Sequence, residues 1–322
     1  MTALTNKIDF MAIISVENAN PNGDPLNGNC PREDYEGYGM ISDVCIKRKL
    51  RNRFQDMGHD IFVQMSERTT DGYKTLKERA LGCPNLYAET SEETEKTAKS
   101  GKKGKGSKKS KQFNTNVACS TWLDVRSFGQ VFAFSEKSGS DDSSESQSGN
   151  GVSVAIRGPV SIRIAKSVNP IRNYDMQITK SVAGESDSDT MGTKHFVDFA
   201  IYVIKGSVNC QLAGLTGFSE EDAQTLHEAL KTLFENDASS ARPEGSMEVC
   251  RLYWWKHDSR YPQTTSAMVH RSVEIIPYGD NQDNPRSIKD FRIRFVNPEN
   301  CVQPEIYAPV EIDSLSEEEQ DR

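Results

Sequence analysis

Apolar residues alternate with polar ones, or recur at helical spacing, in six segments of this chain. Alternation over Ile8–Val16 predicts a strand, because successive strand side chains point to opposite faces. Apolar residues four positions apart predict a helix over Ser42–Met57. The later segments are a strand over Val154–Lys166, a strand over His195–Lys205, a helix over Glu220–Glu235 with Ser219 as N-cap, and a strand over Met247–Trp255. The order β-α-β-β-α-β is typical of ferredoxin-like or RNA-recognition-motif domains, in the α+β class.

A first long insertion interrupts this order between residues 57 and 153. A helical pattern at Gly72–Leu81, together with a more ordered piece rich in apolar residues at Asn116–Phe134, predicts a small helical insertion. Two low-complexity stretches, Glu89–Lys111 and Ser135–Gly151, bury too little apolar surface to offset their ordering entropy, so we expect mobile loops. The Lys/Gly-rich run at 99–111 is either a solvated tether or a hold on phosphate that ignores sequence.

A second insertion, Ser167–Lys194, stands where a hairpin connection of about two to five residues is usual. It keeps four apolar side chains in a polar segment. It is therefore either a long hairpin arm that reaches a partner or a disordered loop. Two further strand-like pieces, Val269–Ile276 and Phe291–Phe295, extend or support the sheet.

The composition predicts a protein of the cytoplasm. At 322 residues, with 35% hydrophobic and 27% charged residues, the chain can bury a sizeable core. Its apolar runs are too short to cross a bilayer, and its first residues lack the apolar centre of a signal peptide. Seven cysteines without a CxxC pair favour reduced thiols. The scattered cysteines and histidines predict no metal and no cofactor.

The charge is segregated along the chain, although the total is −8. Residues 1–111 hold 19 Lys and Arg against 16 Asp and Glu, whereas the last twelve residues hold six acids against one Arg. The predicted first helix carries five cations within seven residues: Lys47, Arg48, Lys49, Arg51 and Arg53. Lys47, Arg48 and Arg51 fall on one arc of that helix, where they either follow a phosphate backbone or form a solvated face.

The polar loop Asn18–Asp24 before this helix superficially matches a calcium loop. Asn29 stands at the twelfth position, where a bidentate Glu is needed, and Pro21 interrupts the pattern. The loop is better explained as a rigid series of turns.

No catalytic motif accompanies the candidate acids Asp24 and Asp43 or the candidate bases His195 and His270. We therefore expect no enzymatic activity. The strand His195–Lys205 also lacks the exposed aromatics on which RNA-recognition motifs stack bases, and Trp254 and Trp255 are expected to pack in the core and at an edge.

Several ordered blocks together resemble the backbone subunit of type I-C CRISPR surveillance complexes, the CRISPR-associated family seven. The blocks are Asn20-Pro21-Asn22-Gly23-Asp24-Pro25, the run from Gly39 to Asn52, Ile156-Arg157-Gly158-Pro159-Val160, Ser167-Val168-Asn169-Pro170-Ile171, Ile178-Thr179-Lys180, Thr190-Met191-Gly192 and Lys256-His257-Asp258-Ser259. Lys180 and Thr193 stand where the pattern has Arg.

The resemblance implies a modified RNA-recognition-motif palm with a helical insertion and a protruding β-hairpin thumb. The implied division is palm at 1–56, helical insertion at 57–153, a palm strand at 154–166, thumb at 167–194, palm again at 195–310 and an acidic tail at 311–322.

The resemblance also implies a function. Copies polymerise head-to-tail along a CRISPR guide RNA, fold a thumb over it and present it for pairing with target DNA in antiviral defence. Further Cascade partners are the pre-crRNA-processing subunit and the large subunit. The implied guide contacts are Asn20, Asn22, Ser42, Lys47, Arg48 and Arg51, and the implied thumb residues are Asn169, Ile171, Met176, Ile178, Thr179 and Met191.

Three alternatives stay open at this point. A related type III backbone subunit cuts target RNA with an Asp in the corresponding loop, where this chain has Asp24. The chain could also be an RNA-binding scaffold outside CRISPR systems, or a scaffold that binds no nucleic acid.

Overall fold

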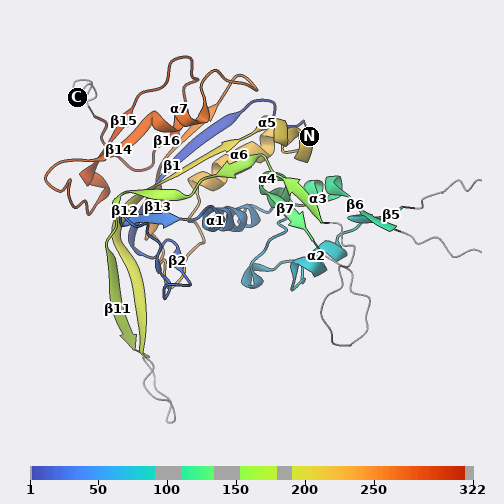
Figure 1. The fold of residues 1–322 in the computed structure, drawn as a ribbon, viewed down its shortest axis with the longest axis horizontal. Helices are drawn as coiled ribbons and strands as arrows, with labels where there is room; N and C mark the ends of the chain where they lie inside the picture. Colours follow the sequence, from blue (N-terminus) through green and yellow to red (C-terminus); the bar gives the residue numbers. More distant parts are fainter. Residues whose placement is uncertain (1, 91–109, 134–152, 180–190, 316–322) are drawn as a thin grey trace, which may run out of the picture.

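A long antiparallel sheet forms the centre of the molecule (Figure 1). The computed structural model describes residues 2–90, 110–133, 153–179 and 191–315. Six strands lie in the order β16–β13–β1–β12–β10–β4, and β9 and β11 also pair with β12. Their bounds are β1 Ile8–Ala19, β4 Tyr38–Ile41, β9 Val160–Ile162, β10 Ala165–Pro170, β11 Asn173–Thr179, β12 Met191–Val208, β13 Met247–Lys256 and β16 Glu305–Tyr307.

Two helices complete the expected β-α-β-β-α-β order: α1 (Asp43–Asp56) and α6 (Glu220–Lys231). The mixed α/β class is thereby confirmed. Ser42 caps α1 by accepting from Cys45 N, and Ser219 forms a capping box with Asp222 at α6. Helix α6 ends at Lys231, before the expected Glu235.

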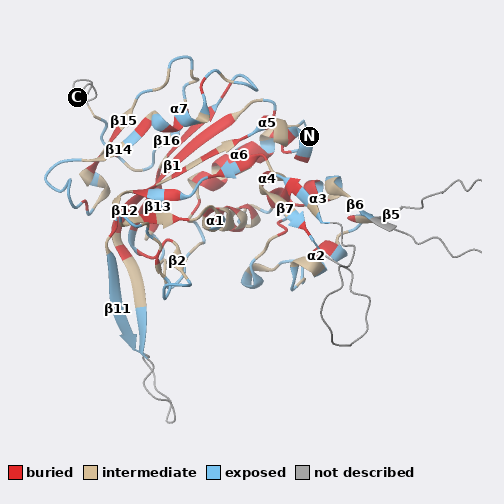
Figure 2. Cartoon of the chain, in the orientation of Figure 1, coloured by how far each residue is buried: buried red, intermediate tan, exposed pale blue. Residues whose placement is uncertain are grey.

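The sheet buries both of its faces. Phe10, Ala12 and Ile14 point to one side, where α1 and α6 pack, while Met11 and Ile13 point to the other. That other side is covered by α7 (Ser266–Arg271), β14 (Val273–Pro277) and β15 (Phe291–Phe295). Figure 2 shows β1 buried along most of its length.

The expected strand over Val269–Ile276 is wrong in its first half, because Val269 and His270 lie in α7, which Thr265 caps. Trp254 and Trp255 are both buried and belong to the cores on opposite faces of the sheet, so the expected core packing is confirmed and the expected edge position is wrong.

The expected single strand Val154–Lys166 is also wrong. It consists of β8 (Val154–Arg157), β9 and β10, and β8 pairs with β7 (Gly129–Phe132) outside the main sheet. The break lies at Gly158-Pro159. A Cβ on Gly158 would lie 2.3 Å from Ser127 O, and Pro159 has no N–H for a ladder.

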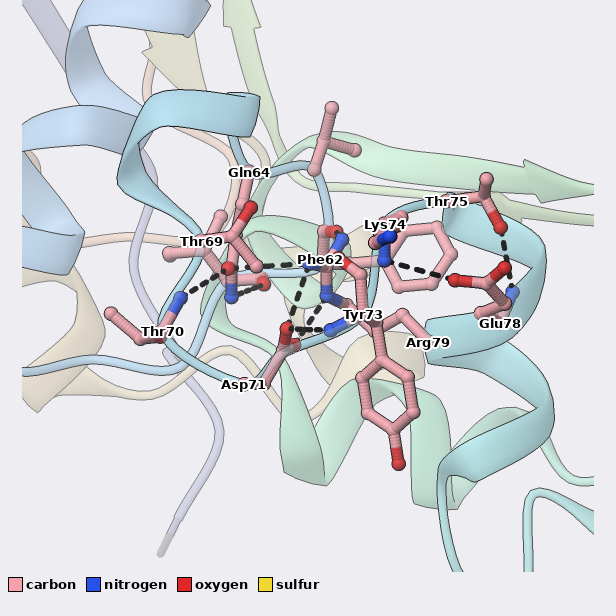
Figure 3. A network of polar contacts seen from close by, with 12 residues as sticks. Phe62, Gln64, Thr69, Thr70, Asp71, Tyr73, Lys74, Thr75, Glu78 and Arg79 are labelled. Atoms are coloured by element: carbon pink, nitrogen blue, oxygen red, sulfur yellow. Dashed lines mark hydrogen bonds and ion pairs between the residues drawn. The ribbon is translucent and has the colours of Figure 1, made fainter.

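The insertion after α1 has an apolar core of its own, which includes Phe62, Trp122 and Phe132. Its remaining elements are a 3-10 turn at Ser66–Arg68, α2 Leu76–Gly82, β5 Tyr87–Thr90, β6 Ser110–Phe113, α3 Thr115–Thr121 and α4 Leu123–Phe128. Arg79 of α2 is buried and ties this unit together (Figure 3). Its guanidinium donates to Phe62 O at 2.9 Å and pairs with Asp71. The hydrogen bonds from Arg79 to the Asp71 carboxylate lower the pKa of Asp71.

The smaller elements are β2 Gly23–Asp24, β3 Cys30–Pro31, α5 Cys210–Thr216 and a 3-10 turn at Ile288–Asp290. The acidic tail does not begin at residue 311. Ile312 is buried in the core beside β15, and Ile293 exchanges backbone hydrogen bonds with Asp313 and Leu315. The residues after 315 lie outside the described ranges.

Candidate nucleic-acid interface

The loop after β1 is joined to the start of α1 by side-chain amides. Asn22 Oδ1 accepts from Ser42 N at 2.9 Å, and Asn20 Nδ2 donates to Asn29 O at 2.7 Å. Asn20 is only 3% exposed, and its Oδ1 has no partner within the described part of the chain. Asn20 therefore shapes the loop from inside, and Asn22 fixes the loop against the helix N-terminus.

Asp24 has a local structural role. Its Oδ1 accepts from Leu26 N at 3.1 Å and lies 3.2 Å from Arg32 Nη2. The carboxylate thus closes the turn between β2 and β3.

All five cations of α1 have partners inside the chain. Lys47 pairs with Asp43 at 2.9 Å, Arg48 donates to Val63 O at 2.7 Å, Lys49 pairs with Asp237, Arg51 pairs with Asp124 at 2.8 Å, and Arg53 pairs with Glu235 at 2.9 Å. The sequence alone does not disclose these partners, because most of them come from distant segments.

Arg51 and Arg48 face the helical insertion. Asp124 is 1% exposed and also accepts from Phe62 N at 2.8 Å and Val63 N at 3.1 Å. The Arg51–Asp124 pair therefore fastens the insertion to the helix. Contact between these arginines and RNA stays a prediction.

Lys49 and Arg53 face the α6 side of the molecule. Lys49 is 4% exposed, and burial lowers its pKa, although Asp237 opposes this shift. Four of the five cations form ion pairs, and among these four the Lys47 side chain is the most exposed, at 23%. Lys47 is thus the cation of α1 best placed for an outside ligand.

Strand β11 and the first part of β12 form a hairpin that projects from the sheet (Figure 1). Every residue of β11 is exposed (Figure 2). One face of the hairpin is largely apolar because the register pairs Tyr174 with Phe196, Met176 with Lys194 and Ile178 with Gly192. The Tyr174 and Phe196 rings stack with centroids 5.9 Å apart.

The opposite face of the hairpin is largely polar. Thr179 pairs with Met191, Gln177 with Thr193, and Asp175 with His195, whose Nδ1 lies 2.6 Å from Asp175 Oδ1. Met191 therefore lies on the face opposite to Met176 and Ile178. The described parts of this segment therefore form an arm, and residues 180–190 lie outside the described ranges.

Two of the predicted thumb residues lie at the base of the arm. Ile171 is 8% exposed and packs in the main core, and Asn169 belongs to β10. Ile171 N donates to Gly37 O at 2.8 Å. A Cβ on Gly39 would lie 2.8 Å from Ile171 Cγ2, so this close approach requires glycine.

The same base contacts the segment between β3 and β4, which follows the polar loop. Glu33 Oε2 accepts from Asn173 Nδ2 at 3.2 Å, Lys166 pairs with Asp34 at 2.6 Å, and β4 pairs with β10. The fold therefore brings the loop, the start of α1 and the base of the arm together at the edge of the sheet that β10 and β4 form. Residues 99–109 of the lysine-rich run 99–111 lie outside the described ranges.

Tyr174 and Lys194 are site candidates that the sequence reasoning missed. Both share the apolar face of the arm with Met176 and Ile178. Tyr174, Met176 and Ile178 occupy every second position, and this strand periodicity in the sequence could have identified Tyr174 as a residue of the same face. Lys194 becomes visible only through the register of the hairpin.

In the described ranges, no three His, Cys, Asp or Glu side chains are arranged to hold a metal ion. Nor does any helix in those ranges have the length and apolar character needed to cross a membrane.

Residues 6–296 match the family model described as CRISPR-associated protein Cas7. A curated protein of that description from Haloferax volcanii is 27% identical over 262 residues, which cover 79% of this chain and 70% of that protein. A solved chain from a "CRISPR RNA-guided surveillance complex, pre-nicking" has a TM-score of 0.45 at 14% identity and 80% coverage of each chain. Another, from a "CRISPR RNA-guided surveillance complex", has a TM-score of 0.40 at 14% identity, with 80% of this chain and 71% of that chain covered.

Proposed function

The chain belongs to the CRISPR-associated Cas7 family, and from this premise we propose that it is the repeating backbone subunit of an RNA-guided surveillance complex. Copies lie head-to-tail along a guide RNA and present it for pairing with target DNA. The sequence blocks favour the type I-C form, with a pre-crRNA-processing subunit and a large subunit as further partners. We propose no catalytic role for the chain, because the Asp24 carboxylate already closes a turn beside Arg32.

The exposed arm carries this proposal. Met176, Ile178 and Met191 are 51%, 48% and 64% exposed on a two-stranded hairpin that projects into solvent. Met176 and Ile178 share one face of the arm and Met191 lies on the other, and exposed apolar side chains on such an arm indicate a binding surface. A strand of RNA laid against the arm, with a neighbouring copy beside it, would cover them.

The guide would lie along the β10–β4 edge of the sheet, where the loop, the start of α1 and the base of the arm meet. Ser42 ends the loop at the positive end of the α1 dipole, where phosphate is favoured. Lys47 lies one turn further along the helix. Arg48, Arg51, Asn20 and Asn22 contribute by holding this surface in shape, and Tyr174 and Lys194 join the thumb residues.

The test is expression with partner subunits and a guide RNA, followed by size measurement and extraction of nucleic acid. We expect an elongated particle with several copies of the chain per RNA, and complementary RNA left uncut by it. Recovery of an RNA-free monomer under these conditions contradicts the proposal.

A further inference from the structure

A second group of cations lies on the opposite side of the sheet from α1 and α6. Lys205 of β12 pairs with Met11 of β1, whose side chain belongs to the core beneath α7 and β15. Lys205 therefore points to the α7 side of the sheet. Arg163 follows β9, and Arg271 ends α7.

Backbone pairing brings these three residues together. Arg163 N donates to Lys205 O at 2.9 Å and continues the β9–β12 register, so both side chains share one face. The α7 end is held to the same strand, because His270 Nε2 lies 3.1 Å from Gly206 O. Arg271 follows directly in the chain.

Four of the five α1 cations pair with a carboxylate, whereas Arg163, Lys205 and Arg271 have no such ion pair among the described residues. Arg163 and Arg271 are exposed, and Lys205 is half-buried. Burial, and then the charges of Arg163 and Arg271, lower the pKa of Lys205. Glu274 opposes this shift, but its carboxylate also lies 3.8 Å from Arg294. The group thus concentrates positive charge on an acidic chain.

A surface hollow of about 300 Å³ adjoins Arg271 and is lined by Arg271, Ser272, Glu274, Arg294 and Val296. Four of these five side chains are polar or charged. The centre of a protein–protein interface is instead depleted in charge, so the lining favours a hydrated anion. Guanidinium groups and lysine are the usual protein partners of phosphate.

We propose that Arg163, Lys205 and Arg271 bind the phosphate backbone of a nucleic-acid strand other than the guide. This proposal rests on the proposed function in one respect: it assumes that a second nucleic-acid strand approaches the guide-loaded particle. The two surfaces lie on opposite sides of the sheet, so each copy can hold two strands without competition. Binding through phosphates is independent of base sequence.

The experiment compares guide-loaded wild-type particles with the double variant Arg163→Gln/Arg271→Gln. Both side chains are exposed, and Lys205 is retained, so folding is preserved. The probe is a labelled oligothymidylate of about 30 nucleotides, and its binding is followed by anisotropy from about 50 to about 200 mM salt. We expect weaker binding in the variant, a salt slope smaller in magnitude by about 1.4 and unchanged guide content, because each lost phosphate contact removes about 0.7 from the slope for single strands.

A matched control, Arg260→Gln/Lys289→Gln, removes two other exposed cations and should leave the slope near that of wild type. An unchanged slope in the Arg163/Arg271 variant overturns the inference. So does a change in copies per particle without a change in slope, which would assign the surface to contacts between copies. The inference is also overturned if these residues bind inorganic phosphate but the particle does not bind the oligonucleotide. If wild-type protein carries no guide yet binds the probe through these arginines, the proposed function fails and this inference stands.

Discussion

At the residue scale, Asp124 has more influence on the candidate interface than any cation of α1. It is 1% exposed and satisfies Arg51 together with two backbone N–H groups of the insertion. Removing one partner from such a buried network leaves desolvated charge and unpaired donors behind. The pair Lys47–Asp43 on the same helix is more exposed and connects residues four apart.

These two pairs predict different costs. Asp124→Ala should lower the free energy of unfolding by about 3–5 kcal/mol, because it leaves Arg51 buried without its partner. Lys47→Met, the matched control on the same helix, should cost less than about 0.5 kcal/mol. Urea denaturation followed by circular dichroism measures both. Equal midpoints for the two variants would contradict the role of Asp124.

At the element scale, the β11–β12 hairpin is organised differently from the rest of the sheet. The main strands bury both faces, whereas β11 buries neither (Figure 2). A two-stranded ribbon has little independent stability, so the arm depends on the long β12 strand that continues into the core. An element built this way can carry apolar side chains without contributing to the core.

Replacing Met176 and Ile178 together by Ser tests this separation. Each side chain is about half exposed, so covering both on assembly should contribute about 2 kcal/mol, or about 30-fold in the association constant. We therefore expect the variant to assemble on guide RNA with an association constant about 30-fold lower, measured by sedimentation. Its urea midpoint should be unchanged.

The control for this pair is Gln177→Ser/Thr193→Ala on the opposite face of the arm. It should assemble like wild type. A fall in the urea midpoint of the Met176/Ile178 variant would instead assign these side chains to the fold.

At the scale of the whole molecule, the net charge of −8 is compatible with RNA binding because charge is distributed unevenly. The start of α1 and the Arg163–Lys205–Arg271 group are separate basic regions on opposite sides of the sheet. Contacts between unlike surfaces of successive copies build an open helix, whose length an RNA can set.

Guide length should therefore control copy number. Doubling the spacer of the guide should about double the copies per particle, because heterologous contacts do not close on themselves. Mass photometry of particles assembled on the two guides measures this. A fixed copy number, or oligomers that persist without RNA after nuclease treatment, would favour a scaffold that assembles by itself.

The sequence by itself determined the main elements, because periodicity and caps are local properties. The bounds of α1 agree to one residue, Ser42 and Ser219 cap as expected, and Phe291–Phe295 is a strand. The ordered blocks also pointed to the family that the comparisons support. The predicted single strand Val154–Lys166 was wrong because Gly158-Pro159 interrupts it.

Only the tertiary structure decided which side chains are available for binding. Arg51 and Asp124 are 73 positions apart, and Lys49 and Asp237 are 188 apart. No local pattern encodes such partners, because they depend on the path of the chain between them. For the same reason, five clustered cations in α1 proved to be engaged inside the fold, while Arg163, Lys205 and Arg271, dispersed in the sequence, came together on one face.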